Sequence, residues 1–333
     1  VRLGGEQRRR RRSPRLMPVR ALAPVATALD GRAIYLLLAA LVAGAALSVP
    51  AFRSADNLAN VLTQAAALGL VAIGQTFVIV AGLIDLSLGQ LLGLVVVLAC
   101  ALMDGHAERT PAAVVLAVGI GAGIGWLNGR LFNLLRVHSL ILTFGTASIL
   151  QGAIFAYTDR SVGAASPQVL WLANGRVGGV PAALLVLALA AAAGHLVLTR
   201  TRFGQHLRAA GGDAESARRA GVDVARVQRV AFVLSGLGAG LGGILVAGRI
   251  GSGYPNAGQA FELDSIVAVV LGGTSLAGGR GSVAGTVAAV LLLAVASNVL
   301  NLLEVPTFMQ TITKGCIVVV AVLLGQRAAG AQR

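Results

Sequence analysis

Asp85 is the residue of this sequence whose surroundings fit its chemistry least well. It stands in the stretch GLIDLSLGQ, residues 82–90, between two long apolar runs. A carboxylate in membrane hydrocarbon costs about 2.5–3.5 kcal/mol on insertion scales, so the charge is expected to have partners. At a helix start, Asp85 would accept the amide hydrogens of Ser87 or Leu88. In a re-entrant break it would instead line a pathway with Ser87 and Gln90, and contact or gate a solute.

Motifs for hydrolytic or metal chemistry are absent from the sequence. It contains no HExxH and no GxSxG, and its 4 histidines have no metal-ligand spacing. A phosphate-cradling GxxxxGK[ST] loop is also absent, and the only lysine, Lys314, lies in a late apolar segment. We therefore expect no enzyme activity, no metal and no cofactor in this chain. If the protein works with ATP, a partner subunit must bind the ATP and its Mg²⁺.

The polar residues inside the apolar segments are mostly neutral amides and hydroxyls. An ion-coupled carrier needs ionisable groups at mid-membrane, and only Asp85 and Lys314 are available, at a segment end and in the last segment. Neutral groups suit a polar, uncharged solute, although such side chains also bond between helices at about 0.6 kcal/mol each. The residues expected to line or gate a pathway are Asp85, Ser87, Gln90, Asn128, Thr143, Thr146, Thr274 and Ser275.

The composition indicates a chain made mainly of membrane-spanning helices. Of its 333 residues, 56% are hydrophobic and 12% charged, and 44 are glycine, which excludes an ordinary soluble enzyme. Because one span needs about 20 mostly apolar residues, the sequence predicts an all-α, polytopic integral membrane protein with about ten transmembrane helices. The expected spans are 33–51, 58–81, 84–103, 111–134, 139–158, 180–199, 228–248, 262–277, 281–303 and 308–325.

The distribution of arginine predicts the orientation of these spans. The net charge is +14, and the run RRRRR precedes the first apolar segment without a cleavage site after it. Residues 1–32 are therefore interpreted as a basic cytoplasmic arm, with a nucleic-acid-binding arm as the alternative. Translation could begin at Val1 or Met17. Since the remaining arginines also favour the side of this arm, both termini, including the tail 326–333, are expected to be cytoplasmic.

One longer polar segment interrupts the array of spans, at residues 200–227. Its pattern predicts a short helix, a Gly-Gly break followed by Asp213 as N-cap, a second helix ending near Gly221, and a third helix capped by Asp223. Compact helices joined rigidly to two spans could transmit motion from a cytoplasmic partner. The segment could equally be a basic connector held at an anionic membrane surface.

Two glycine-rich stretches repeat small residues every four positions. They are GIGAGIGWLNG at 119–129 and SGLGAGLGG at 235–243. This spacing lets helix backbones approach closely in a membrane. We expect both stretches to pack helices within one bundle, with a moving interface as the alternative.

Four stretches of the sequence resemble the permease subunits of bacterial ABC importers for monosaccharides, of the ribose, xylose, galactose and autoinducer-2 type. They are GLIDLSLGQ (82–90), LNGRLFNLLRVHSLILTFGTASILQG (127–152), TRFGQHLRAAGGDAESARRAGVDVARVQRVAFVLSG (201–236) and ELDSIVAVVLGGTSLAGGRGSVAGT (262–286). With their spacing they cover nearly the whole chain after the N-terminal arm. Branched-chain amino acid permeases share parts of this pattern.

The resemblance implies a transmembrane permease domain over 33–325 that works with three partners. These are a cytoplasmic ATP-binding subunit, a periplasmic sugar-binding protein and a second permease chain, in a homodimer or pseudo-dimer in the bacterial inner membrane. The segment 200–227 would dock into the ATPase. The implied coupling residues are Gly211, Gly212, Asp213, Ala217, Ala220, Gly221 and Val222. Glu262 and Asp264 would lie near the outer surface, where a binding protein could dock, and Asp264 could also cap a helix.

The sequence departs from the family pattern in three places. The usual Gly-Gly before Ile-Asp is here Gly82-Leu83, and Gln90 replaces a commoner small residue. His138-Ser139 stand where a proline is typical before the Leu-Thr-X-Gly-Thr block. These departures bear on local helix starts and on the substrate rather than on the fold.

Together these features predict a permease subunit that moves a neutral sugar inward by alternating access, with a separate ATPase and a periplasmic binding protein. Two alternatives stay open. The same architecture could move branched-chain amino acids or nucleosides, or the chain could be an ion-coupled secondary carrier or a channel that works without ATP.

Overall fold

The computed structural model describes residues 33–306, 308–310, 312 and 315. Nearly all regular structure within them is helical, which confirms the predicted all-α class. In chain order the elements are α2 (Ala33–Ser48), η2 (Pro50–Arg53), α3 (Ala55–Val80), α4 (Leu88–Met103), η3 (Ala107–Arg109), α5 (Thr110–Leu135), α6 (Ser139–Tyr157), α7 (Pro167–Asn174), β1 (Arg176–Val177), β2 (Val180–Pro181), α8 (Ala182–Arg200), α9 (Arg202–Gly212), α10 (Ala214–Arg219), α11 (Val224–Ile250), α12 (Phe261–Leu271) and α13 (Val283–Leu302). The basic arm 1–32, most of the tenth expected span and the tail 326–333 lie outside the described residues.

Six of the described helices are long and apolar enough to cross a membrane, namely α3, α5, α6, α8, α11 and α13. Helices α2 and α4 have 16 residues each, and α12 has only 11. At 1.5 Å per residue, α2 and α4 are about 24 Å long and α12 is about 16 Å long. All three are shorter than a hydrocarbon core of about 30 Å. The expected number of about ten spanning helices is therefore not confirmed.

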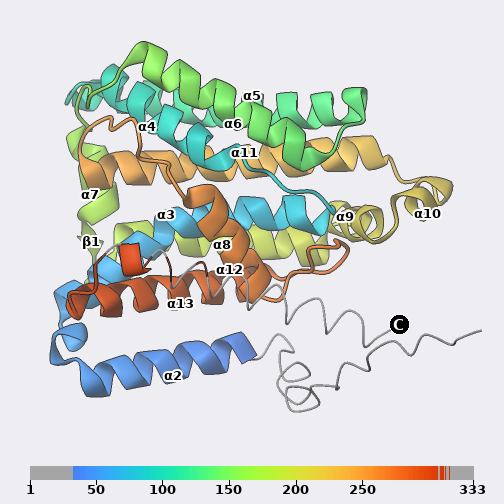
Figure 1. The fold of residues 1–333 in the computed structure, drawn as a ribbon. Coiled ribbons are helices and arrows are strands. Elements are labelled where there is room, and N and C mark those ends of the chain that lie inside the picture. The colour runs from blue at the N-terminus through green and yellow to red at the C-terminus, as the bar shows by residue number, and fades with distance from the viewer. Residues whose placement is uncertain (1–32, 307, 311, 313–314, 316–333) are drawn as a thin grey trace, which may run out of the picture.

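The long helices lie side by side in a bundle whose two ends differ (Figure 1). α7 and the small hairpin of β1 and β2 lie at one end, on the left in Figure 1, whereas α9 and α10 project at the other. We call these the α7 end and the α10 end. In the hairpin, Arg176 pairs with Pro181 and Val177 with Val180 in antiparallel register.

Helix α3 is the central helix of the bundle. Every residue from Gly69 to Val80 is buried, on all sides of the helix, as expected for an apolar helix enclosed by others. Its glycines set the distances to its neighbours. A Cβ built on Gly74 would lie 2.8 Å from the Cα of Ser235 on α11, closer than real side-chain atoms approach a backbone.

The two glycine-rich stretches pack α5 against α11, as the sequence predicted. Gly121 and Gly125 of α5 lie directly against the backbone of Gly236 and Phe232 on α11. A Cβ built on Gly240 of α11 would lie 2.5 Å from the carbonyl oxygen of Ala117. Such close approach increases the van der Waals contact between the two helices. This contact stabilises the pair in lipid, where the hydrophobic effect does not drive helix association.

The chain breaks its helical path directly after α3. Gly82 adopts φ +78°, a conformation that glycine reaches without strain. The amides of Gly82 and Leu83 donate to the carbonyls of Ile79 and Val78, which is the Schellman pattern of a helix end. Leu83 is not among the residues with positive φ, so this position does not need the second glycine of the family pattern. Residues 81–87 are called the first break.

Another non-helical stretch, residues 251–260, runs from the α7 end into the bundle along α4. Gly253 lies against Val97, and Gly258 lies against Gly89. Since Gly89 precedes Val97 by 8 positions, the stretch descends about 12 Å between these two contacts, to a level about 21 Å from the end of α4 at Met103. The expected span at 262–277 is therefore wrong in extent: α12 begins deep in the bundle and ends at Leu271, before Gly273 with φ +85°.

We predict that Gly125→Ala destabilises the protein, because the new methyl group meets the Phe232 carbonyl and must push α5 away from α11. The expected loss is about 1–3 kcal/mol, measured as a lower thermal unfolding temperature of the detergent-purified chain. Gly123→Ala is the matched control, since nothing lies within 4 Å of the added atom. Equal unfolding temperatures for the two variants would contradict a close α5–α11 contact.

Candidate functional site

The first break is held in place by side chains of α6. Inside an apolar bundle, the backbone amides of a non-helical segment find no water and need partners from the protein. The Ser139 hydroxyl accepts the amide hydrogen of Ile84 at 3.1 Å, and the Thr143 hydroxyl accepts that of Leu86 at 3.0 Å. Two hydroxyls one helical turn apart on α6 thus accept the backbone amide hydrogens that a neighbouring strand would accept in a sheet.

The residue before Ser139 explains how α6 starts without the proline of the family pattern. His138 is the N-cap residue, with φ −64° and ψ 136°, and its Nδ1 atom accepts the amide hydrogen of Leu140. A φ near −65° is the value that proline would impose. His138 therefore reaches the same backbone conformation, and Ser139 is free to support the break.

Asp85 lies in the middle of the first break and is 1% exposed. Its Oδ1 atom accepts the amide hydrogen of Ser87 at 3.0 Å and the Ser87 hydroxyl at 2.6 Å. Its Oδ2 atom accepts the hydroxyl of Ser235, on α11, at 3.2 Å. The bond to the Ser87 amide is the one expected from the sequence. Because α4 begins only at Leu88, Asp85 fixes the break as well as the helix start.

A chain of hydrogen bonds extends from Ser87 to α5 and α6. The Asn128 amide donates to the Ser87 hydroxyl at 3.0 Å, and the Thr146 hydroxyl donates to the Asn128 oxygen at 2.7 Å. The first break, α5, α6 and α11 are therefore joined through one polar group of side chains. We call this group the break cluster; it consists of Asp85, Ser87, Asn128, Ser139, Thr143, Thr146 and Ser235.

The break cluster contains five of the eight residues that the sequence suggested for a pathway. Gln90 lies partly buried in the first turn of α4. Thr274 and Ser275 belong to a different non-helical stretch, residues 272–282, which we call the second break. There the Thr274 hydroxyl accepts the amide hydrogen of Ser282 at 3.4 Å, and the Ser275 amide donates to the Arg280 carbonyl at 3.0 Å.

Sequence reasoning missed Ser139 and Ser235 as members of this site. Ser235 stands at the start of a glycine-rich stretch, and Ser139 at a helix start, so each had a simpler local explanation. A signal was present for Ser139, because it precedes Thr143 by four positions and both face the same side of a helix. Nothing local identifies Ser235, since its partner Asp85 is 150 positions away.

The cluster can position groups rather than react. Apart from Asp85, its members are neutral hydroxyls and an amide, and the carboxylate already accepts three hydrogen bonds. Within the described part of the chain, no group of three or more His, Cys, Asp or Glu could hold a metal ion. The arrangement suits the support of a helix break inside an apolar bundle.

The segment 200–227 forms the three helices that the sequence predicted, but the expected Gly-Gly break is wrong, because α9 continues through Gly211 and ends at Gly212. Asp213 caps α10, accepting the amide hydrogens of Glu215 and Ser216 at 3.0 and 3.1 Å, and Asp223 caps α11 through the amide of Arg226 at 2.9 Å. The Ser216 hydroxyl also donates to Asp213 at 2.6 Å, and its bonds hold the pKa of Asp213 below the usual value. The caps therefore fix the angles between three consecutive helices.

Gly211, near the end of α9, connects this segment to both breaks. It lies directly against the carbonyl of Val80, where α3 ends, and a Cβ built on it would be 2.8 Å from the amide nitrogen of Gly279 in the second break. The Gly279 amide in turn donates to the Val80 carbonyl at 2.9 Å. α9 thus contacts the end of α3 and the second break at one point. By contrast, nothing lies within 4 Å of a Cβ built on Gly212.

The other expected coupling residues lie on and after α10. Ala217 is buried in the main core cluster, and its carbonyl accepts the amide hydrogen of Val222 at 3.0 Å. Gly221 turns the chain with φ +84°, and Ala220 is exposed. Glu215 forms exposed ion pairs with Arg218 and Arg219, at 3.5 and 3.2 Å. This leaves one face of α10 open at the α10 end.

Glu262 and Asp264 lie in the first turn of α12, deep in the bundle, and not near an outer surface as expected. Glu262 packs against Gly89, and its Oε2 atom is buried without a hydrogen-bond partner in the described part of the chain. The sequence had placed the start of this helix at the membrane surface, whereas residues 251–260 carry it inward through a series of turns. A role of these carboxylates in docking stays a prediction.

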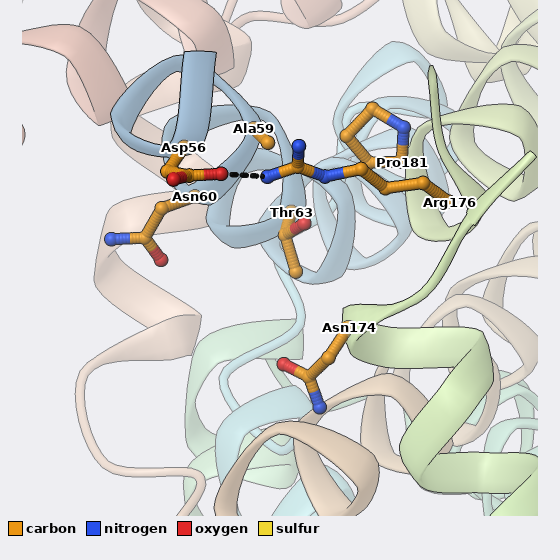
Figure 2. A pocket seen from close by; sticks show the side chains of 7 residues that line it. All are labelled: Asp56, Ala59, Asn60, Thr63, Asn174, Arg176 and Pro181. Carbon is orange, nitrogen blue, oxygen red and sulfur yellow. Dashed lines mark hydrogen bonds and ion pairs between the residues drawn. The ribbon is translucent and has the colours of Figure 1, made fainter. Parts of the chain in front are cut away.

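A small polar pocket of about 150 Å³ opens at the α7 end (Figure 2). Arg176 crosses it and pairs with Asp56 at 2.7 Å. Nearby, the Arg249 guanidinium donates to Asn60 at 2.9 Å. The lining residues are Asp56, Ala59, Asn60, Thr63, Asn174, Arg176 and Pro181. These polar groups lie on the end of the bundle opposite to α10.

Comparison with known proteins identifies a family and several relatives. Residues 57–322 match the family described as "Branched-chain amino acid transport system / permease component". The chain is 36% identical to the ribose import permease protein RbsC of Escherichia coli (strain K12) over 283 residues, which cover 84% of this chain and 88% of the relative. It is 36% identical to RbsC of Bacillus subtilis (strain 168), with 84% and 87% covered.

A third relative is the xylose transport system permease protein XylH of Escherichia coli (strain K12). Identity is 31% over 337 residues, covering 82% of this chain and 85% of the relative. No solved structure matches the chain. These matches confirm the resemblance that the four sequence stretches indicated.

We predict that Asp85→Ala strongly destabilises the protein, whereas Asp85→Asn does not. Alanine leaves the Ser87 amide, the Ser87 hydroxyl and the Ser235 hydroxyl without their acceptor, at a cost of roughly 2–4 kcal/mol. Asparagine retains one acceptor oxygen for Ser87, and Ser235 can accept from its amide group. Thermal unfolding in detergent measures both. An equal loss in the two variants would show that the charge, rather than the hydrogen bonds, stabilises the break.

Proposed function

Because the chain belongs to the family of transport-system permease components, we propose that it is the membrane-spanning subunit of an ATP-driven importer for a neutral monosaccharide. The observation that carries the choice of solute is the similarity to permeases of ribose and of xylose, each over more than four fifths of the chain. The hydroxyls and the amide that make up the break cluster apart from Asp85 agree with it. A sugar offers hydroxyls and a ring oxygen, none of them charged, which amides and hydroxyls can match without burying a charge.

The family description names branched-chain amino acids, which makes them the second candidate solute. Such a molecule carries an ammonium and a carboxylate at neutral pH, and both need partners inside the membrane. Asp85 is the one carboxylate of the break cluster, and its oxygens are already engaged by Ser87 and Ser235. Within the break cluster, this favours an uncharged solute.

The partners follow from the two ends of the bundle. We propose that a cytoplasmic ATP-binding subunit docks at the α10 end and binds the ATP and Mg²⁺. A periplasmic sugar-binding protein would deliver the solute at the α7 end, and a second permease chain would complete the pathway. With this orientation both termini are cytoplasmic. The arginine-rich segment 200–227 then lies on the cytoplasmic side, as the positive-inside rule requires.

Alternating access would use the contact between α9 and the two breaks. When the ATPase moves α10, the Asp213 cap transmits the movement to α9, and Gly211 transmits it to the end of α3 and to the second break. Asp85 is proposed as a positioning residue that keeps the first break in one shape while α3 moves. Loops and helix ends are the usual hinges of such motions.

We predict that Gly211→Ala uncouples transport from ATP hydrolysis, because its methyl group displaces α9 from Val80. In the reconstituted importer, solute-stimulated ATP hydrolysis should fall roughly 3- to 30-fold. Gly212→Ala is the matched control, since it makes the same change next in the helix without a contact. Stimulation that is equally high in both variants would contradict the coupling role of Gly211.

Reconstitution tests the proposed function itself. In liposomes, the purified chain alone should take up neither ribose nor leucine, with or without an ion gradient, because it has no ATPase. With its ATP-binding subunit and binding protein, it should take up a monosaccharide on addition of ATP. Gradient-driven uptake by the chain alone would make it a secondary carrier, and ATP-driven uptake of leucine in place of sugar would change the solute.

A further inference from the structure

A second pocket, of about 210 Å³, lies near the α10 end between α5 and α11, and the proposed function does not use it. It is lined by Arg130, Asn133, Leu134 and Arg229. Two guanidinium groups from different helices therefore border one small cavity. The chemistry of such a pair is the recognition of a phosphate group, which arginine binds with parallel hydrogen bonds.

The close packing of α5 and α11 creates this pair. A Cβ built on Gly129 would lie 2.7 Å from the Cα of Arg229, so the two helices touch beside Arg130. Asn133 fixes the contact, because its amide group donates to the carbonyls of Gly129 and Ala225 at 2.7 and 3.3 Å. The pocket is thus built by rigid helices rather than by loops.

The two arginines lack a carboxylate partner. None of the four ion pairs found among the described residues includes Arg130 or Arg229. The Nε atom of Arg229 is buried and has no hydrogen-bond partner there. Arg130 lies over the ring of Trp126, 5.7 Å from its centroid, which orients the guanidinium without neutralising it. The pocket therefore holds two positive charges and one unused buried donor.

The position of the pocket indicates where its ligand comes from. Arg229 follows the start of α11 by five residues, and Arg130 precedes the end of α5 by five, so both lie about 7.5 Å inside the helix ends. Trp126 and Leu134 on the same helix are 47% and 68% exposed. A charged pocket near the helix ends and beside an apolar helix face fits a lipid better than a dissolved anion.

We propose that this pocket binds the phosphate group of an anionic phospholipid, with the acyl chains lying along α5. The site goes beyond the proposed transport function and does not depend on the solute. In the orientation proposed above, it faces the cytoplasmic leaflet. A bound lipid would neutralise Arg130 and Arg229 and fill the junction of α5 and α11.

The experiment uses Trp126 as a reporter, since Trp171 is the only other tryptophan of the chain. Full-length protein with Trp171→Phe is placed in phosphatidylcholine vesicles that contain a small fraction of brominated phosphatidylglycerol or, separately, brominated phosphatidylcholine. Bromine quenches a tryptophan only at short range, so the ratio of the two quenching curves gives the preference for the anionic lipid. We expect a preference of about 5- to 30-fold at low salt.

The double variant Arg130→Gln and Arg229→Gln should lower this preference to about that of phosphatidylcholine. Arg226→Gln is the matched control, because it removes an exposed arginine from the same end of α11 and should change the preference little. An undiminished preference in the double variant would overturn the proposal, and so would an equal loss in the control.

Two further arms distinguish other occupants. If inorganic phosphate abolishes the preference when sodium chloride of equal ionic strength does not, the pocket takes free phosphate and the lipid assignment is wrong. If the ATP-binding subunit abolishes it, the pocket is a protein contact and the assignment is again wrong. Because quenching needs no solute and no ATP, its failure would leave the proposed transport function intact, and a failure of uptake would leave the lipid site intact.

Discussion

The structure depends on one constraint, which is that a helix broken inside an apolar bundle must find partners for its free backbone groups within the protein. The first break meets this constraint with three sets of atoms. The hydroxyls of α6 accept the amides of Ile84 and Leu86, the Asp85 carboxylate accepts the amide of Ser87, and the end of α3 closes on its own carbonyls. Without them the break would carry unpaired donors at a cost of several kcal/mol each in hydrocarbon. A hydrogen-bond acceptor at position 85, between two apolar runs, is therefore a structural requirement here.

Glycine supplies the second general device of this fold. It permits the turn at Gly82, and it removes the side chains that would keep α5 from α11 and α9 from Val80. The two uses have a common effect, since each brings backbone against backbone where lipid offers no hydrophobic drive. The result is a stiff connection from α10 through α9 to both breaks. In the proposed coupling, a movement at the α10 end then reaches α3, the helix around which the bundle is packed.

The two ends of the bundle differ in how their charges are arranged. At the α7 end, Arg176 and Arg249 have partners in Asp56 and Asn60, whereas at the α10 end Arg130 and Arg229 face a pocket without a carboxylate. Arginines that already have a partner suit a surface that a second protein binds and leaves. Their guanidinium groups stay hydrogen-bonded when that protein dissociates. In the proposed lipid site, the guanidiniums of Arg130 and Arg229 would be stabilised by the negative surface potential of the membrane. The same residue type thus serves different surfaces according to its neighbours.

The sequence by itself determined the features that depend on composition or on neighbours a few positions apart. These include the all-α membrane class, the caps Asp213 and Asp223, the acceptor role of Asp85 toward Ser87, and the helix-packing use of the glycine-rich stretches. Each follows from apolar content or from contacts within about one helical turn.

Only the tertiary structure decided which distant residues complete these local features. It brought Ser235 to Asp85 across 150 positions, Gly211 to Val80, and Arg229 to Arg130. It also carried residues 251–260 into the bundle, so that α12 is short and Glu262 lies deep. An apolar sequence does not specify these pairings, because hydrophobic periodicity identifies a span but not the helix beside it. The partners are set by close fit between helices and by the need to satisfy each buried polar group, and both are properties of the assembled bundle.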